Sequence, residues 1–426
     1  MSLWPLVKLD AVTVAKPGTR NPAVNPDQYF LYVDISSIDN SLKKIVDAKR
    51  ILGAEAPSRA RKIIRAGDII VSTTRPNLNA VALVPNEFDG QICSTGFCVL
   101  RPTNEILADY LFHFVRSEGF VRCLSTSVSG ALYPAVTDGQ VRGLRIPLPP
   151  LTEQRRIVDI LNHAAGIRRL RRQALDKTRA LIPALFIDIF GDPENNPQQW
   201  PVVPLGELII GGPQNGLYKH ISAYGEGTPI LRIDAFYDGI VTKLHSLRRL
   251  RLSSDEIDRY GLKENDIVIN RVNSPEYLGK SAIIPMLSEP TVFESNMMRF
   301  SLDLKRTKPR YIIQYLQTAY IKQHILSNAK HAINQSSINQ QDVKSMPVPV
   351  PPLDQQETFA ARVAEVHSLI TQQERHLAQA EALLQSLMAR FFNGTETGDT
   401  SRSVYTMPVE DMEIPLAAEE TEKYLK

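Results

Sequence analysis

The side chains that could perform catalysis in this 426-residue chain form no complete active-site pattern. Gly279-Lys280-Ser281 resembles the end of a phosphate-binding loop, but Ser274 stands where such a loop requires a glycine. No Asn/Asp-Pro-Pro-Tyr/Phe tetrapeptide is present to hold a target amine. The eight histidines lack metal-ligand spacing, and three cysteines are too few for a zinc site or a disulfide framework. We therefore expect no catalysis, metal or cofactor in this chain.

Polar loops offer a different chemistry, which is hydrogen bonding to a nucleic acid. Amides, guanidiniums and hydroxyls can bond base edges, and basic side chains can bind phosphates. Such loops follow the apolar segments 67–71 and 265–269, and others lie earlier or later in each half of the chain. The candidate contacts are Arg20, Asn21, Thr74, Arg75, Asn77, Ser129, Tyr133, Asn215, Tyr218, Lys219, Arg271, Asn273, Ser274, Gln335 and Ser336. The alternative for each is a solvated turn, because such residues also form turns.

Arg75 and Arg271 are the strongest of these candidates. They are offset by 196 positions and follow corresponding apolar segments, so we expect them to be matched by position. A guanidinium after a strand in both places is harder to explain by turn formation than an amide or a hydroxyl.

The loops belong to a sequence that repeats itself. Trp4-Pro5-Leu6 recurs as Trp200-Pro201-Val202, and residues 141–151 recur as 343–353. Aligned without gaps, residues 141–190 and 343–392 share eleven identities in fifty positions. Each copy runs from short apolar segments through a proline-rich junction to a long helical pattern. An internal repeat of this size predicts two domains of similar plan.

The element order predicts an α+β protein. We expect mixed α/β domains at residues 1–148 and 193–350, each followed by a proline box and a long helix at 149–192 and 351–392. Residues 393–426 carry eight acidic and three basic side chains, and we expect this tail to be unstructured.

The two long helices carry heptad stripes. The predicted seam positions are Ile160, Ile167, Leu181 and Leu185 in the first helix and Val366, Leu369, Leu383 and Leu387 in the second. Residues 152–189 have a net charge of +4 and residues 354–392 of −2, so the helices should attract each other. The alternative is that each helix packs on its own domain. Pro183 predicts that the first helix bends or ends near that residue.

The charge and hydropathy of the chain are compatible with a polyanionic partner. The net charge of +3 combines a tail of −5 with a body of +8 over the first 392 residues. No run of 18 apolar residues and no export signal is visible, so we expect no membrane contact and a cytoplasmic location.

The two-copy plan resembles the specificity subunit of type I restriction–modification systems. The resemblance covers residues 1–392 and rests on the boxes Pro149-Pro150-Leu151-Thr152-Glu153-Gln154 and Pro351-Pro352-Leu353-Asp354-Gln355-Gln356, each followed by a long helix. It implies two target-recognition domains in a pseudo-twofold arrangement, separated by an antiparallel coiled coil of the two helices. Each domain would read one half of a bipartite DNA target, and different loops imply different half-sites.

The resemblance also implies partners. Two methyltransferase subunits would dock on this subunit, motor–nuclease subunits could join them, and S-adenosylmethionine would bind the methyltransferase rather than this chain. Two other interpretations stay open. One is a stand-alone, non-enzymatic DNA-binding or adaptor protein of the same architecture, and the other, opposed by the lack of catalytic motifs, is a fused nuclease–methyltransferase.

Overall fold

The computed structural model describes residues 4–126, 134–332 and 335–392 of the chain. The chain forms two compact units. The first unit holds the described residues up to Ala164 together with those from Leu383 onward, and the second holds Ala165–Ala382. Each unit therefore includes parts of both long helices. The predicted acidic tail lies outside the described residues.

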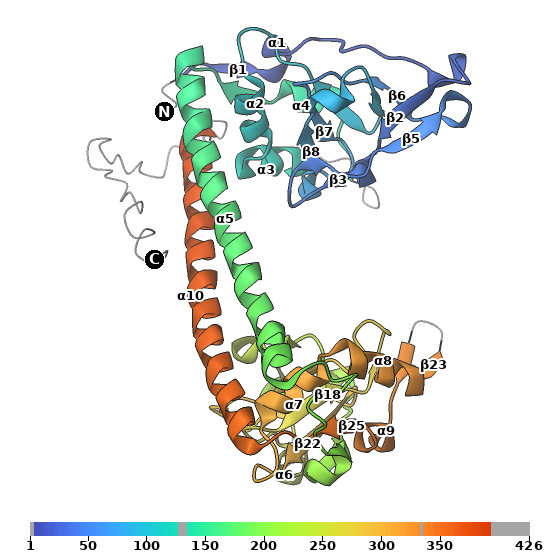
Figure 1. The fold of residues 1–426 in the computed structure, drawn as a ribbon. Helices are drawn as coiled ribbons and strands as arrows, with labels where there is room; N and C mark the ends of the chain where they lie inside the picture. The colour runs from blue at the N-terminus through green and yellow to red at the C-terminus, as the bar shows by residue number, and fades with distance from the viewer. Residues whose placement is uncertain (1–3, 127–133, 333–334, 393–426) are drawn as a thin grey trace, which may run out of the picture. The chain divides into compact units, whose positions relative to one another are not determined.

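The first unit is built on a three-stranded sheet, order β10-β7-β8, and a four-stranded sheet, order β5-β2-β9-β6. Its strands are β1 (Leu6–Lys8), β2 (Tyr29–Val33), β3 (Ile38–Asp39), β4 (Lys44–Ile45), β5 (Lys49–Leu52), β6 (Ala60–Ile63), β7 (Ile69–Ser72), β8 (Val81–Leu83), β9 (Ile92–Ser94), β10 (Phe97–Leu100) and β11 (Arg145–Pro147). Its short helices are α1 (Leu9–Val12), α2 (Ala108–Val115), α3 (Glu118–Thr126) and α4 (Asp138–Gly143) (Figure 1). The apolar run of β7 is buried along its whole length, as expected for the middle strand of a sheet.

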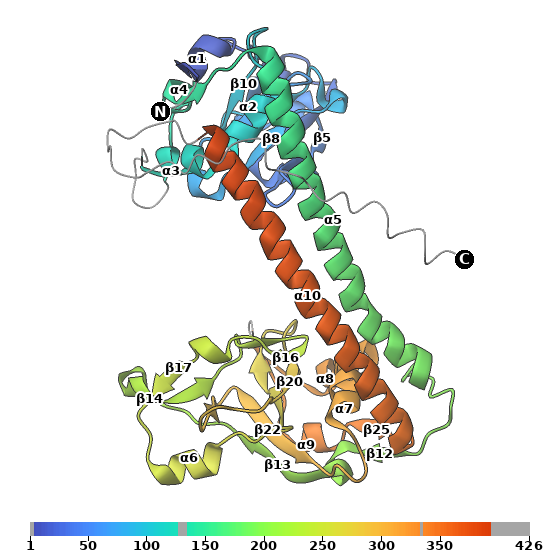
Figure 2. The ribbon, with the colours of Figure 1, turned by 90° about the vertical axis from the view of Figure 1, so that its left-hand side faces the viewer.

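The second unit is built on a six-stranded sheet, order β13-β22-β18-β20-β16-β15, with two three-stranded sheets, β17-β14-β21 and β19-β24-β23. Its strands are β12 (Val202–Pro204), β13 (Ile209–Asn215), β14 (Tyr224–Leu231), β15 (Phe236–Tyr237), β16 (Gly239–Val241), β17 (Arg248–Leu250), β18 (Ile267–Asn270), β19 (Val272–Asn273), β20 (Ser281–Ile283), β21 (Val292–Phe293), β22 (Met297–Leu302), β23 (Lys330–Ala332), β24 (Gln335–Ser337) and β25 (Pro347–Pro349). Its short helices are α6 (Ser254–Tyr260), α7 (Pro309–Leu316), α8 (Ala319–Asn328) and α9 (Gln340–Lys344) (Figure 2).

The two units repeat one strand plan, as the sequence repeat predicts. β1 pairs with β11 in the first unit, and β12 pairs with β25 in the second, both antiparallel. β2 lies antiparallel to β5 and parallel to β9, while β14 lies antiparallel to β17 and parallel to β21. The central strands β7 and β18 each lie between two antiparallel neighbours. The predicted α+β class with two mixed domains is confirmed.

The two long helices are α5 (Leu151–Phe190) and α10 (Leu353–Phe392), each of 40 residues. α5 does not end at Pro183 but continues to Phe190, and both Phe186 and Phe190 are buried. A proline inside a helix costs about 3 kcal/mol because one hydrogen bond is lost. Burying two phenylalanine side chains stabilises the fold by about 3–6 kcal/mol in total, so packing can offset that cost.

In the second unit the two helices run antiparallel to each other (Figures 1 and 2). Arg172 Nη2 lies 3.1 Å from Glu381 Oε1, and Arg179 Nη2 lies 2.7 Å from Glu374 Oε1. From the first pair to the second, the residue number rises by seven in α5 and falls by seven in α10. Only antiparallel helices allow this. Each exposed pair stabilises by only about 0.5 kcal/mol. These pairs therefore favour one orientation more than they add stability.

The buried stripes of the helices differ from the predicted seam. Val366 is buried, and Ile160, Leu185 and Leu387 are partly buried. The other four predicted positions are wrong, since their side chains are 45–47 % exposed: Ile167, Leu181, Leu369 and Leu383. The buried apolar residues are instead Ile157, Val158, Leu161, Ala164, Leu175, Phe186 and Phe190 in α5 and Phe359, Val363, Val366, Leu377, Ala380, Leu384, Met388 and Phe392 in α10. One residue turns an α-helix by about 100°, so beginning the first stripe at Ile160 instead of Leu161 rotates it away from the contact.

Candidate nucleic-acid interface

In the first unit, the loop that follows β7 is held by the segment 134–136. Thr74 forms an isolated antiparallel bridge with Ala135, and the Arg75 amide donates to the Pro134 carbonyl at 2.8 Å. Arg75 has a left-handed backbone (φ 47°), and its side chain and that of Asn77 are exposed. The structure thus brings the predicted loop at 72–79 against the chain that follows the predicted loop at 129–133. Ser129 and Tyr133 themselves lie outside the described residues.

In the second unit, the corresponding loops pair as strands. β19 lies antiparallel to β24, with Asn273 opposite Ser336 and Val272 opposite Ser337. Gln335 is exposed, whereas Ser336 is only 2 % exposed and its hydroxyl lies 2.9 Å from His331 Nδ1. Ser336 is therefore unavailable to a base in this conformation. Ser274, partly buried, donates its amide to Asn273 Oδ1, which is the local turn bonding that was the alternative to DNA contact.

Arg75 and Arg271 do not occupy equivalent places, so their predicted match is wrong. The Thr73 amide donates to Gly96 O and its carbonyl accepts from Val136 N. Arg271 has the same pattern, donating to Asn296 O and accepting from Ile338 N. Arg271 is thus the counterpart of Thr73, and the counterpart of Arg75 is Asn273, because strand pairing and not residue type fixes the register. Arg271 is also partly buried and donates to the Ser295 carbonyl.

The candidates nearer the start of each half lie on other loops. Arg20 is exposed and donates from Nη2 to the Gly90 carbonyl at 3.2 Å. Asn21 caps the short 3₁₀ turn Pro22–Val24 by accepting from the Ala23 amide, so it has a turn role.

Three more candidates follow or end β13 in the second unit. Asn215, at the end of β13, is exposed, and Tyr218 is 77 % exposed. Lys219 Nζ lies 2.5 Å from Glu256 Oε1, and this ammonium, together with the Ser253 amide, lowers the pKa of Glu256. The charge of Lys219 is therefore already compensated within the unit, whereas Tyr218 stays open to a ligand.

Comparison with known proteins decides the family. Residues 29–173 and 197–382 match the family model described as the type I restriction modification DNA specificity domain. The chain belongs to this family. It is 24 % identical to the type I restriction enzyme EcoKI specificity subunit of Escherichia coli K12, over 92 % of this chain and 89 % of that protein. It is 25 % identical to the StySPI specificity subunit of Salmonella potsdam, with the same coverage.

A solved structure of the same family supports the assignment. A chain from a structure described as the basis of complex assembly and conformational transition of the type I R-M system is 32 % identical, with a TM-score of 0.62. The match covers 91 % of this chain and 97 % of that one. The chain is therefore a DNA sequence-specificity subunit, and its polar loops are candidates for reading bases.

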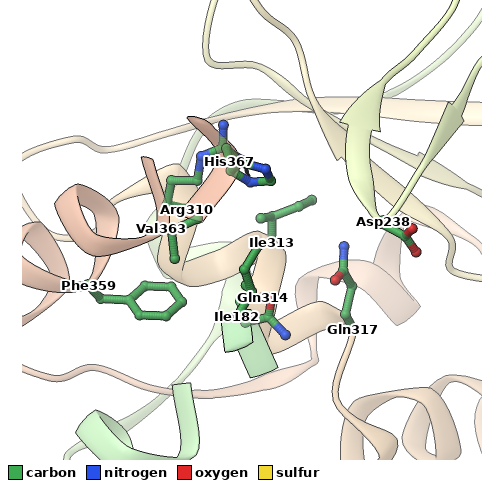
Figure 3. A pocket seen from close by; sticks show the side chains of 9 residues that line it. All are labelled: Ile182, Asp238, Arg310, Ile313, Gln314, Gln317, Phe359, Val363 and His367. Carbon is green, nitrogen blue, oxygen red and sulfur yellow. Dashed lines mark hydrogen bonds between the residues drawn. The ribbon is translucent and has the colours of Figure 1, made fainter. Parts of the chain in front are cut away.

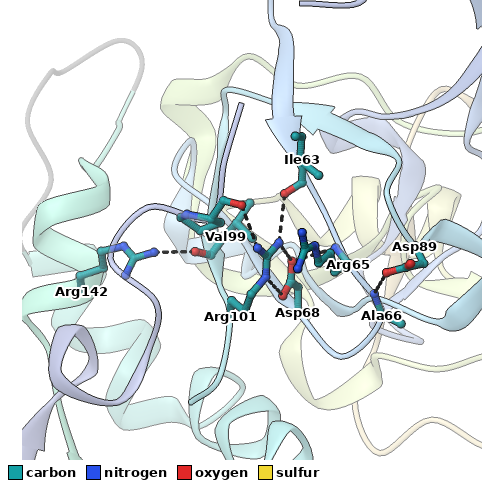
Figure 4. A network of polar contacts seen from close by, with 9 residues as sticks. Ile63, Arg65, Ala66, Asp68, Asp89, Val99, Arg101 and Arg142 are labelled. Carbon is teal, nitrogen blue, oxygen red and sulfur yellow. Dashed lines mark hydrogen bonds and ion pairs between the residues drawn. The ribbon is translucent and has the colours of Figure 1, made fainter. Parts of the chain in front are cut away.

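A buried ion pair supports the loops of the first domain of this specificity subunit (Figure 4). Arg101 donates from Nε and Nη2 to the two carboxylate oxygens of Asp68, at 2.8 and 2.7 Å, and from Nη1 to the Pro17 carbonyl at 2.8 Å. The bonds to Asp68 raise the pKa of Arg101. In the second domain Arg299 Nη1 lies 3.7 Å from Asp266 Oδ2. By strand register, however, Ser301 stands at the position of Arg101, and its hydroxyl donates to Asp266 Oδ1 at 2.5 Å. Sequence reasoning missed both arginines, although both aspartates stand in the repeated Asp-Ile segments.

Two basic edge strands were also missed. β5 carries Lys49 and Arg50 beside Tyr32 and Leu31, and β17 carries Arg248 and Arg249 beside Ile230 and Pro229. All four basic side chains are exposed, and both strands lie at the edge of their sheets. Lys49 pairs with Asp34 and Arg249 with Glu289, so Arg50 and Arg248 are the better candidates for phosphate binding. Charged edge strands also discourage pairing with another strand. Adjacent basic residues at equivalent positions in the repeat are the signal that could have revealed them.

Neither a membrane span nor a metal cluster occurs among the described residues. No helix there is long and apolar enough to cross a membrane. No group of three His, Cys, Asp or Glu side chains there is placed to hold a metal ion.

Proposed function

We propose that each half of this specificity subunit reads one half of a bipartite, asymmetric DNA target. The observation that supports this is the equivalence of two loops with different side chains. Thr74 and Arg75 occupy the backbone positions that Val272 and Asn273 occupy in the second unit. A guanidinium favours guanine and an amide favours adenine in the major groove, so equivalent loops with these groups would read different bases.

The long helices would set the distance between the two half-sites. A 40-residue helix spans about 60 Å at 1.5 Å per residue, and the antiparallel pairing seen in the second unit would stiffen it. The helices would also carry the docking surface for two methyltransferase subunits, and motor–nuclease subunits could join them. In this proposal S-adenosylmethionine binds the methyltransferase, this chain performs no chemistry, and the complex acts in the cytoplasm.

The test is co-expression of this chain with its methyltransferase subunit, followed by mapping of methylated bases in host DNA. We expect methylation at two different short sequences separated by an unread gap. A continuous short target, or methylation that does not depend on this chain, would reject the proposal. Failure to copurify with any methyltransferase would instead favour a stand-alone DNA-binding protein.

Paired variants separate base contacts from phosphate contacts. We expect Arg75→Ala to relax the preference at one position of the first half-site and to leave the second half-site unchanged. We expect Arg50→Gln to weaken binding to all sequences alike. It should also reduce the slope of log affinity against log salt concentration by about one. If Arg75→Ala altered both half-sites equally, its assignment to base reading would be wrong.

A further inference from the structure

A polar pocket lies between α7, α10 and the end of α5 in the second unit (Figure 3). Its volume is about 240 Å³, including the space open to solvent. Arg310 and Gln314 line it from α7, Gln317 lines it directly after that helix, and His367 lines it from α10. Asp238, in the turn between β15 and β16, also lines it, and Figure 3 places this side chain on the opposite side from Arg310. We name this the Arg310 pocket.

Arg310 is a partly buried arginine of α7. Its Nη1 atom lies 3.4 Å from His367 Nε2, and within the described residues no carboxylate forms an ion pair with it. Burial lowers the pKa of the Arg310 guanidinium. Burial, and then the charge of Arg310, lower the pKa of His367, which favours the neutral ring.

Three poorly exposed arginines of the chain have carboxylate partners. The side chains of Arg101, Arg142 and Arg299 are 16 %, 10 % and 17 % exposed, and they pair with Asp68, Asp10 and Asp266. A charged group that leaves water without a partner is unfavourable, because lost hydration is not replaced. Arg310 therefore lacks the carboxylate partner that these three arginines have within the described residues.

The shape of the pocket selects the kind of anion. The guanidinium is recessed between helices, so a narrow group on a flexible stem can reach it. A phosphodiester continues into a sugar on both sides and does not fit such a recess. A carboxylate fits, because it is planar and can accept two parallel hydrogen bonds from a guanidinium.

We propose that the Arg310 pocket binds the carboxylate of an aspartate or glutamate that a docking protein subunit inserts between α7 and α10. This inference rests on the proposed function, in which protein subunits dock on the long helices. The side-chain amides of Gln314 and Gln317 supply further donors at the pocket.

The first unit lacks this site. Tyr110 and Tyr311 each donate to the carbonyl of a proline that ends the strand before a proline box, Pro147 and Pro349, so they are counterparts. The residue before each is Asp109 in the first unit and Arg310 in the second. Asp109, which is exposed, offers an incoming carboxylate no hydrogen-bond donor. Two identical partners would therefore make this contact only at the second half.

The test uses the complex of this chain with the methyltransferase subunit. We expect Arg310→Met to weaken docking at one of the two sites by about thirtyfold or more, the smallest loss typical when a buried charge partner is removed. The matched control is Arg306→Met, because Arg306 lies just before α7 but pairs with the exposed Glu207. We expect less than a twofold change for this control. If wild type binds two partners and Arg310→Met binds both equally well, the inference fails while the proposed function stands.

The free chain provides a second readout. Replacing an unpaired guanidinium by methionine should leave the melting temperature of the free chain unchanged or raise it, whereas a structural arginine would lower it on removal. Sodium acetate should raise the melting temperature of wild type above that in sodium chloride of equal ionic strength, and should not do so for Arg310→Met. Stabilisation by inorganic phosphate but not by acetate would overturn the assignment to carboxylates.

Discussion

Asp68 and Arg101 join three segments of the first unit, because Arg101 also holds the Pro17 carbonyl. The aspartate side chain is 1 % exposed, so its charge depends on Arg101 and on the Arg65 amide. Removing one partner of a buried pair leaves the other charge uncompensated, which costs about 3–5 kcal/mol.

We expect Asp68→Asn to destabilise the first unit by about 3 kcal/mol, since Arg101 loses its counterion. Denaturant unfolding followed by hydrogen exchange of residues in β7 and β10 measures this loss. The control is Glu118→Gln, which breaks the exposed pair with Arg122 and should cost less than about 1 kcal/mol. Equal effects of the two variants would show that burial of the pair contributes nothing.

His113 predicts a dependence of stability on pH. Its side chain is 2 % exposed and lies 2.9 Å from Asn162 Oδ1, and burial lowers its pKa to about 4. The folded state keeps the ring neutral while the unfolded chain takes up a proton near pH 6.5. Its contribution is therefore complete above pH 6.5 and is lost as the pH falls towards 4, up to about 3 kcal/mol.

The variant His113→Gln removes this titration. We expect its free energy of unfolding to fall less than that of wild type between pH 7 and pH 4.5, even if it is lower at pH 7. Urea unfolding at several pH values measures both slopes. An unchanged slope would mean that His113 does not carry the acid sensitivity.

At the scale of elements, each unit is completed by the end of the long helix that starts in the other half of the repeat. Phe392 of α10 packs 5.3 Å from Tyr110 and 5.6 Å from Phe114 between ring centres. Phe190 of α5 packs 4.9 Å from Tyr311 in the corresponding place. Replacing such a buried ring by alanine costs about 3–5 kcal/mol.

These contacts predict crossed effects. Phe392→Ala should speed hydrogen exchange in α2 and leave α7 unchanged, and Phe190→Ala should do the reverse. Each variant is the control of the other, because both remove the same side chain from equivalent helix ends. If either variant increased hydrogen exchange equally in both units, the end of α10 would not belong to the first unit alone, nor the end of α5 to the second.

Sequence reasoning predicted these elements better than it predicted their contacts. The proline boxes and apolar periodicity indicated both long helices, and the buried run of β7 was visible as consecutive apolar residues. The predicted seam was displaced from the buried stripe because Ile160 and Leu161 are adjacent and both apolar. The heptad spacing of apolar residues therefore did not decide between two neighbouring stripes. Arg271 was matched with Arg75 by residue type, whereas hydrogen-bond register pairs it with Thr73. Asp68 and Arg101 are 33 positions apart, and no local pattern joins them.

At the scale of the whole molecule, the length of α5 and α10 should set the gap in the DNA target. Inserting one heptad into both helices lengthens each by about 10 Å, which corresponds to about three base pairs at 3.4 Å per step. We expect the methylated target to keep both half-sites and to gain about three unread base pairs. Insertion into α5 alone would break the pairing with α10 and is the control that should abolish methylation. An unchanged gap in the doubly extended protein would show that the helices do not measure the target.

The place of Phe392 in the first unit bears on how the protein is made. During translation, Tyr110 and Phe114 emerge from the ribosome long before the last turn of α10 is synthesised. Until that turn emerges, the apolar site that it will fill stays open in the nascent chain. A truncated mRNA that ends before codon 392 would therefore yield a protein whose first unit has an incompletely packed core. Proteases can degrade such a truncated protein before it competes with the intact protein for partners.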